Sequence, residues 1–145
     1  MLVDANLLLF ATDETSVFHT RARVWLTEQL NGARRVGFPW QTLAAFLRIA
    51  THPRVYADPL APDAAWKRVL DWLASDVSWI PAPGPRHVEL LGQLLTRHSV
   101  GGNLVPDAQL AALALEHGLT VYSADTDFAR FVEVRWENPV GPHAG

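Results

Sequence analysis

The sequence predicts an α/β domain with a short, mainly parallel central sheet, and two observations support this class. Apolar residues recur at helical spacing in five segments, and short β-prone segments lie between and after them. Helices that alternate with short apolar strands are typical of a parallel sheet covered by helices. The chain has 145 residues, of which 49% are apolar and 19% charged, so it suits one folded domain rather than two domains or a disordered segment.

Each expected element follows from its local pattern. A helix is expected to open at Asn6, directly after the first strand, and to continue to Ala11. The five helical stripes fall at residues 18–26, 43–50, 66–73, 88–95 and 106–117. The expected strands are residues 1–4, 35–38, 77–80, 119–123 and 134–136.

Two of these helices have apolar stripes that predict a buried face. In the helix over residues 66–73 the stripe is Trp66, Val69, Leu70 and Leu73. In the helix over residues 88–95 it is Val88, Leu91 and Leu95. Both stripes repeat every three or four residues, so each predicts the side that packs on the sheet.

The clearest helix boundaries are those of the segment from Pro106 to His117. Proline is favoured at the first helical position, and Gly118 is expected just beyond the last one. Gly32 is expected to end the helix over residues 18–26 in a similar way. Residues 1–138 are expected to form one domain, with residues 139–145 as a frayed C-terminal tail.

Several classes of protein are excluded by composition. The chain has no cysteine, which excludes disulfides, a thiol nucleophile and every zinc site that needs cysteine. The longest uncharged run is the 12 residues from Val36 to Leu47, and a membrane span needs about 20. No basic segment precedes the first strand, so no signal peptide is expected, and the cytoplasm is the expected location.

Four aspartates stand where strands meet helices. Asp4 ends the first strand, Asp107 lies in the first turn of the Pro106 helix, and Asp125 and Asp127 follow the strand over residues 119–123. Any one of them alone is most simply a helix cap. Together they predict a cluster, because the strand ends and helix starts of a parallel sheet meet at one edge.

Clustered carboxylates need a cation, and oxygen ligands suit Mg²⁺ or Mn²⁺. Such a site is typical of phosphodiester chemistry.

These residues lie in motifs that resemble the PIN domain, and more closely the VapC-type toxins of bacterial type II toxin–antitoxin pairs. The motifs are MLVDAN at residues 1–6, FLRIATHP at 46–53, GNLVPDA at 102–108 and SADTDF at 123–128. The resemblance covers essentially the whole chain. It implies a PIN-like three-layer α/β/α domain with helices on both faces of the sheet.

The resemblance also implies a function, a cofactor and partners. The expected protein is a Mg²⁺-dependent endoribonuclease that a cognate VapB-type antitoxin holds inactive, and that forms a homodimer and toxin–antitoxin hetero-oligomers. Mn²⁺ is the expected substitute for Mg²⁺. Asp4 and Asp107 match the family's metal ligands, Asp125 a further acidic position and Asp127 an accessory one.

The sequence departs from the PIN pattern at one position. The family usually carries a glutamate in the third helical segment, where this chain has Ala45. The missing ligand favours one well-held Mg²⁺ over two. Three side chains are candidates to compensate: Asp127, Thr42 and Ser123. Asn6 and Asn103 are expected either to orient ligands at the site or to act as caps.

Other conspicuous side chains carry weaker signals. Trp25 and Trp66 are expected in the core or an interface. Trp40 and Trp72 are expected at contacts with another protein chain. At Trp40, packing is favoured over base stacking. Arg48 suits either an RNA backbone contact or a solvated helix face. The histidines form no metal-binding motif, and a catalytic role for them is disfavoured.

Two alternative functions remain open from the sequence. A haloacid-dehalogenase-like phosphatase would use Asp4 as its nucleophile, but Asn6 replaces the second aspartate of its motif and Lys67 is the sole lysine. A module that binds RNA or antitoxin without cutting is the other alternative, because the acid at Ala45 is missing.

The net charge does not oppose RNA binding. The chain has 12 Lys and Arg residues and 15 Asp and Glu residues, a formal charge of −3. Without the four aspartates of the expected site, 11 acidic residues face 12 basic ones, a charge of +1. Much of the acidity therefore belongs to the site, where a bound cation would offset it.

Overall fold

The computed structural model describes residues 1–142, which form one parallel five-stranded sheet. The strands are β1 (Leu2–Val3), β2 (Val36–Gly37), β3 (Ser78–Trp79), β4 (Val121–Tyr122) and β5 (Trp136–Glu137). Their order across the sheet is β3-β2-β1-β4-β5, and Leu2 of β1 pairs with Gly37 on one side and Val121 on the other. The five strands expected from sequence are all present, each shorter than expected.

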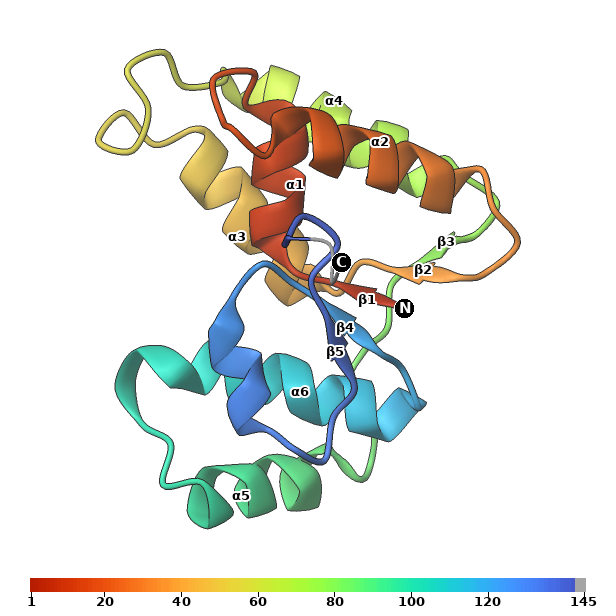
Figure 1. The fold of residues 1–145 in the computed structure, drawn as a ribbon, viewed down its shortest axis with the longest axis vertical. Coiled ribbons are helices and arrows are strands. Elements are labelled where there is room, and N and C mark those ends of the chain that lie inside the picture. The colour runs from red at the N-terminus through yellow and green to blue at the C-terminus, as the bar shows by residue number, and fades with distance from the viewer. Residues whose placement is uncertain (143–145) are drawn as a thin grey trace.

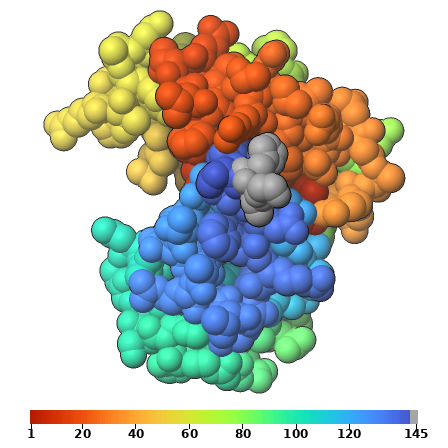
Figure 2. Space-filling view, viewed as in Figure 1, coloured from red at the N-terminus to blue at the C-terminus, as the bar shows by residue number. Residues whose placement is uncertain are grey.

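Helices cover both faces of this sheet. They are α1 (Ala5–Thr12), α2 (His19–Leu30), α3 (Trp40–Ala50), α4 (Pro62–Leu73), α5 (His87–Arg97) and α6 (Val105–His117), with 3₁₀ helices η1 (Gly102–Leu104) and η2 (Thr126–Arg130). Figure 1 shows α1 to α4 above the sheet and α5 and α6 below it. In the space-filling view the outline narrows between these two halves (Figure 2). The predicted three-layer α/β/α architecture is confirmed.

The alternation of side chains along each strand builds two separate cores. Leu2 and Val121 belong to the core under α5 and α6, whereas Val3 and Tyr122 belong to the core under α1 to α4. Successive residues of a strand point to opposite faces, so two-residue strands supply one side chain to each core. All four side chains are buried, and their burial holds β1 and β4 at the centre of the molecule.

The apolar stripes predicted on α4 and α5 are only partly confirmed. Val69 is buried, and Leu73, Leu91 and Leu95 are partly buried against the two cores. On α4, Trp66 and Leu70 are exposed, and the helix packs through Ala65, Val69 and Trp72. Each helix carries apolar residues on two adjacent stripes, so periodicity alone does not select the one that meets the sheet.

On α5, Val88 is exposed, and Leu90 and Leu94 are the buried residues. Trp72 was expected at a protein contact and instead lies in the core. Its ring stacks on Phe38 at 6.4 Å and meets the edge of Phe46 at 4.8 Å between ring centroids.

Two glycines set the limits of the segment that carries α6. Gly102 has φ of +58° and Gly118 has φ of +66°, a region that residues with a Cβ rarely adopt. Gly118 is the expected left-handed C-terminal residue, and its N–H bonds to the carbonyl of Leu115. The helix begins at Val105, one residue before the predicted start at Pro106.

The expected tail is only partly outside the domain. Val140 is 1% exposed and belongs to the core under α1 to α4, and Arg21 donates to its carbonyl oxygen. Residues 139–142 are therefore docked rather than frayed, while residues 143–145 lie outside the described residues. Within residues 1–142, none of the helices is both long and apolar enough to span a bilayer.

Candidate active site at the carboxyl edge of the sheet

The candidate site lies where the strand order reverses. The chain builds β2 and β3 on one side of β1, then returns to place β4 and β5 on the other. Ligands of open parallel sheets bind outside the carboxyl ends of the strands at such a switch point. Asp4 directly follows β1, Ser123 directly follows β4, and the first turn of α6 carries Asp107 to the same edge.

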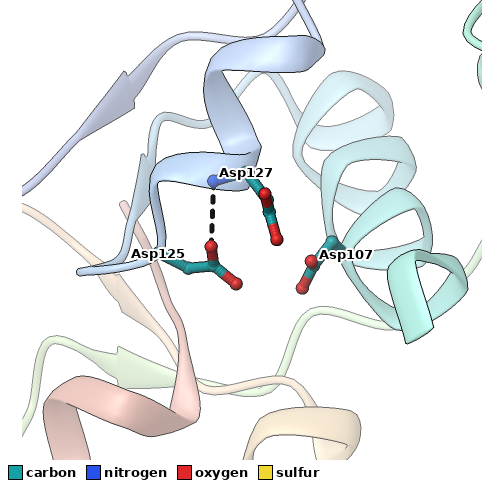
Figure 3. A group of neighbouring side chains, drawn as sticks. All are labelled: Asp107, Asp125 and Asp127. Carbon is teal, nitrogen blue, oxygen red and sulfur yellow. Dashed lines mark hydrogen bonds between the residues drawn. The ribbon is translucent and has the colours of Figure 1, made fainter.

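Three carboxylates converge at this edge. One oxygen from each of Asp107, Asp125 and Asp127 lies within 4.8 Å of the others. Figure 3 shows Asp107 reaching across from α6 toward the two aspartates of the η2 turn. Asp125 caps η2 by accepting a hydrogen bond from the N–H of Asp127 at 2.9 Å, which holds both carboxylates on the side that faces Asp107.

Asp4 lies beside this triad and is held by its own hydrogen bonds. Its Oδ1 accepts from the N–H of Ala5 at 2.8 Å, so it caps α1 as its position predicted. Its Oδ2 accepts from the Ser123 hydroxyl at 2.7 Å and from the Asn6 amide at 3.3 Å. The sequence assigned Asp4 to the metal and Asp127 to an accessory position, whereas the tightest group in the structure includes Asp127 and leaves Asp4 as a neighbour.

Ser123 and Asn6 join the end of β1 to the turn after β4. Ser123 Oγ accepts from the N–H of Asp125 and from Asn6 Nδ2, both at 3.0 Å. Asn6 Oδ1 in turn accepts from the N–H of Ala124 at 3.1 Å. Both side chains therefore position carboxylates, which is one of the roles expected for them.

The electrostatics of the site favour a bound cation. Burial raises the pKa of Asp107 to about 7, and the charges of Asp125, Asp4 and Asp127 act in the same direction. Burial also raises the pKa of Asp4, while the hydrogen bond from Ser123 opposes the rise. Within residues 1–142 none of the ion pairs includes any of these four aspartates. Oxygen donors without a protein counter-charge fit a hard divalent ion.

The first turn of α3 contacts α6 beside the acidic cluster. Gln41 Nε2 donates to the carbonyl oxygen of Pro106 at 2.6 Å, next to Asp107. Ala45 follows Gln41 by four residues and therefore lies on the same side of α3. The site role of Gln41 was missed from sequence, although its spacing from Ala45 is a usable signal.

The candidates to compensate for Ala45 behave differently. Thr42 is buried, and its hydroxyl donates to the carbonyl of Val3 at 2.7 Å, so it fastens α3 to β1 rather than facing the carboxylates. Ser123 contacts Asp4, and Asp127 belongs to the triad.

The remaining side chains considered from sequence lie elsewhere. Asn103 is exposed in η1, ahead of α6. Arg48 is exposed in the last turn of α3, and the site contacts the first turn. Lys67 pairs with Asp71 on the exposed side of α4, so it does not supply the positive charge that an Asp4-based phosphatase requires.

Comparison with known proteins agrees with this geometry. Residues 1–134 match the sequence model of the PIN domain. This chain belongs to the PIN domain family. It is 46% identical over 138 residues to ribonuclease VapC37 of Mycobacterium tuberculosis, covering 95% of this chain and 96% of the relative. It is 38% identical over 140 residues to ribonuclease VapC33 of the same species, covering 97% and 98%. The resemblance to VapC proteins predicted from the motifs is confirmed.

Solved structures share the PIN fold at low sequence identity. VapBC2 from Rickettsia felis, bound to a DNA fragment from its promoter, superposes with a TM-score of 0.70 at 14% identity, covering 94% of this chain and 96% of that one. The sarcin-ricin loop cleaving toxin VapC20 of Mycobacterium tuberculosis gives a TM-score of 0.65 at 22% identity, covering 92% and 98%. Both cover nearly the whole PIN domain, which supports the fold described above.

Proposed function

We propose that this PIN domain is a Mg²⁺-dependent endoribonuclease and the toxin of a type II toxin–antitoxin pair. The observation that carries the proposal is the convergence of Asp107, Asp125 and Asp127 within 4.8 Å at the carboxyl edge of the sheet. The relatives named as VapC ribonucleases support the substrate class. The proposal includes a VapB-type antitoxin as partner, a homodimer, toxin–antitoxin hetero-oligomers, and the cytoplasm as the location.

The four aspartates have different proposed roles at the site. Asp4 and Asp107 are ligands of the ion, and Asp125 is a further ligand or the base that orients the attacking water, with Asp127 beside it. When bound, Mg²⁺ or Mn²⁺ would offset the charge of the phosphodiester and lower the pKa of water. Asp4 is held ready by Ser123, Asn6 and Ala5, so it needs little reorganisation to act.

The proposed reaction is hydrolysis by in-line displacement at phosphorus. A water oxygen forms the new bond to phosphorus and gives its proton to a carboxylate of the site, while the bond from phosphorus to O3′ breaks and O3′ takes up a proton from solvent. The products are a 5′-phosphate and a 3′-hydroxyl. Asp125 is the candidate to accept this proton, because Asp107 would be a ligand of the ion and a bound cation would lower its pKa.

The decisive experiment is sequencing of RNA ends after induced expression of the chain, with Asp4→Ala as control. New 5′-phosphate ends that appear with the unmodified chain and are absent with Asp4→Ala are the expected result. In vitro, Mg²⁺ or Mn²⁺ is expected to support cleavage of the same RNA, and EDTA to stop it. Unchanged cleavage by Asp107→Asn would contradict the site assignment.

The alternative of a binding module without cleavage is distinguished in the same assay. Its basis is Ala45, which leaves the site one carboxylate short of the usual PIN set. A non-cleaving module would retard RNA in a gel with Mg²⁺ present and leave its length unchanged. Co-purification with the product of a neighbouring small gene would support the antitoxin partnership.

A further inference from the structure

A second concave feature lies at the same edge of the sheet, next to the acidic site. It is a cleft of about 280 Å³ between the first turn of α3, the loop after β3, and α6. The residues that line it include Trp40 and Gln41 from α3, Pro81 and His87 from beyond β3, and Gln109 from α6. Its volume is near the lower end of small-molecule sites, which begin at ~300 Å³, so one planar group fits it better than a large ligand.

The cleft adjoins the acidic site through Gln41. Gln41 lines the cleft and also donates its hydrogen bond to Pro106, the residue before Asp107. Gln109 lies two residues after Asp107 on α6, so its side chain is turned to another side of the helix, where it lines the cleft. A chain bound with one phosphate at the carboxylates therefore has a neighbouring unit within reach of the cleft.

The lining matches the chemistry of an unpaired nucleobase. Trp40 is 53% exposed although it is a large aromatic residue, so its ring is available for stacking. The amides of Gln41 and Gln109 supply both donors and acceptors, the groups that read base edges in single-stranded RNA. Pro81 adds apolar surface beside them.

Charge distinguishes this cleft from the one at the end of α1. The cleft at the end of α1, of about 320 Å³, is lined by three acidic residues, Asp13, Glu14 and Asp58, and by one basic residue, Arg68. Its net negative charge would repel a polyanion. Among the described residues that line the Trp40 cleft, none is acidic. A nucleic-acid chain is thus favoured at the Trp40 cleft and disfavoured at the α1 cleft.

We propose that the Trp40 cleft is a nucleobase subsite, which takes one unpaired base of the RNA while a nearby phosphate lies at the carboxylates. This inference rests on the proposed ribonuclease function and adds to it a determinant of substrate choice. Trp40 stacks on the base, and Gln41 and Gln109 select among bases by their hydrogen bonds. The subsite would make the enzyme prefer single-stranded loops, because a paired base is not free to enter the cleft.

The test is binding of an eight-nucleotide single-stranded RNA by the full-length chain, measured by fluorescence anisotropy with Ca²⁺ in place of Mg²⁺, so that the carboxylates are neutralised and cleavage is slowed. Trp40→Ala is expected to weaken binding about 5- to 100-fold, the range for loss of one base–aromatic stack. Trp40→Phe is expected to keep most of the affinity, because a ring remains. Trp66→Ala is the matched control, since Trp66 is 42% exposed on α4 and lines neither the cleft nor the acidic site, and it is expected to change nothing.

A second arm replaces single nucleotides of the same RNA by abasic ones. At one position the abasic RNA is expected to bind the unmodified chain and Trp40→Ala equally, because the base that stacks is gone. Equal binding of the intact RNA by the unmodified chain and Trp40→Ala would overturn the subsite. A loss of affinity in Trp40→Ala that persists at every abasic position would also overturn it. So would a Trp40→Ala variant that changes only its sedimentation coefficient, because that result would mark Trp40 as a protein contact.

Cleavage with Mg²⁺ separates failure of the subsite from failure of the proposed function. Trp40→Ala is expected to raise KM and to relax the choice of cut site. If the unmodified chain cuts RNA and Trp40→Ala cuts it at the same sites with the same KM, the subsite is wrong and the ribonuclease stands. If the unmodified chain cuts no RNA yet binding depends on Trp40 and one base, the ribonuclease is wrong and the subsite stands.

Discussion

The hydroxyl of Ser123 donates a 2.7 Å hydrogen bond to Oδ2 of Asp4, and so joins two residues 119 positions apart in the chain. Asp4 ends β1 and Ser123 follows β4, the two adjacent central strands. The same hydroxyl accepts from the N–H of Asp125. One buried side chain thus sets the relative positions of two carboxylates of the candidate site.

Replacement of Ser123 by alanine is expected to lower stability and to release Asp4. Ser123 is fully buried, and the change leaves its hydrogen-bond partners unsatisfied, so we expect a loss of about 1–3 kcal/mol in the free energy of unfolding. The pKa of Asp4 is expected to rise further, because the hydrogen bond from Ser123 lowers it. Urea unfolding and NMR titration of Asp4 measure the two effects.

Ser75→Ala is the matched control for Ser123→Ala. Ser75 donates to the carbonyl of Leu30 at 2.6 Å, away from the carboxylates. Ser75→Ala is expected to reduce stability without changing the pKa of Asp4. An unchanged Asp4 titration in Ser123→Ala would show that the hydroxyl does not control this carboxylate.

The metal-free protein is expected to lose stability as pH rises from about 4 to about 7. Asp107 has its pKa raised from 3.8 to about 7, so the folded chain holds this proton more tightly than the unfolded chain. The resulting stabilisation is complete below the unfolded pKa and is lost as pH rises through the folded one. Water screens this half-exposed carboxylate, so we expect a loss of about 1 kcal/mol rather than the full value of such a shift.

Urea unfolding in EDTA between pH 4 and pH 8 measures this dependence. Asp107→Asn is expected to remove most of this dependence, because the amide does not titrate. Asp76→Asn changes an exposed aspartate before β3 and should keep the dependence of the unmodified chain. A pH dependence of equal size in Asp107→Asn would mean that another group is responsible.

Mn²⁺ or Mg²⁺ is expected to raise the melting temperature, because the ion relieves repulsion among Asp107, Asp125 and Asp127.

Asp127→Asn removes one member of this triad and should weaken Mn²⁺ binding at least about tenfold. Even residues that contact a ligand of the ion, and not the ion itself, change metal affinity about 10- to 100-fold. Isothermal titration calorimetry provides the affinities. Asp58→Asn, in the cleft at the end of α1, is the control and should bind Mn²⁺ normally. Equal affinity in Asp127→Asn and the unmodified chain would exclude Asp127 from the ion site.

Ala45→Glu tests the position where the PIN pattern usually has an acid. We expect the unmodified chain to bind one Mn²⁺ and Ala45→Glu to bind Mn²⁺ more tightly or to gain a second ion. Without metal, the added charge should raise the pKa of Asp107 further and lower stability above pH 7. Ala44→Glu, on the exposed side of the same helix, is the control for the added charge alone. Identical Mn²⁺ binding by both variants would show that residue 45 does not face the ion.

Periodicity predicted the order of the helices and strands, but not which stripe of a helix faces inward. Helix α4 has apolar side chains on neighbouring stripes. Trp72 lies in the core because its ring packs against Phe38 and Phe46. Trp66 is left in solvent. A buried face is chosen by the shape of the surface it meets, and residues distant in sequence form that surface.

The sequence by itself determined the α/β class, the PIN resemblance and the aspartates at strand and helix ends, because these features depend on local pattern and composition. Only the tertiary structure decided which carboxylates form the tight group. Asp125 and Asp127 turn toward Asp107 through the cap of η2, while Asp4 is held by Ser123 across β1 and β4. Distances of a few ångströms between charges arise from packing of the sheet and helices, and spacing along the chain does not contain them.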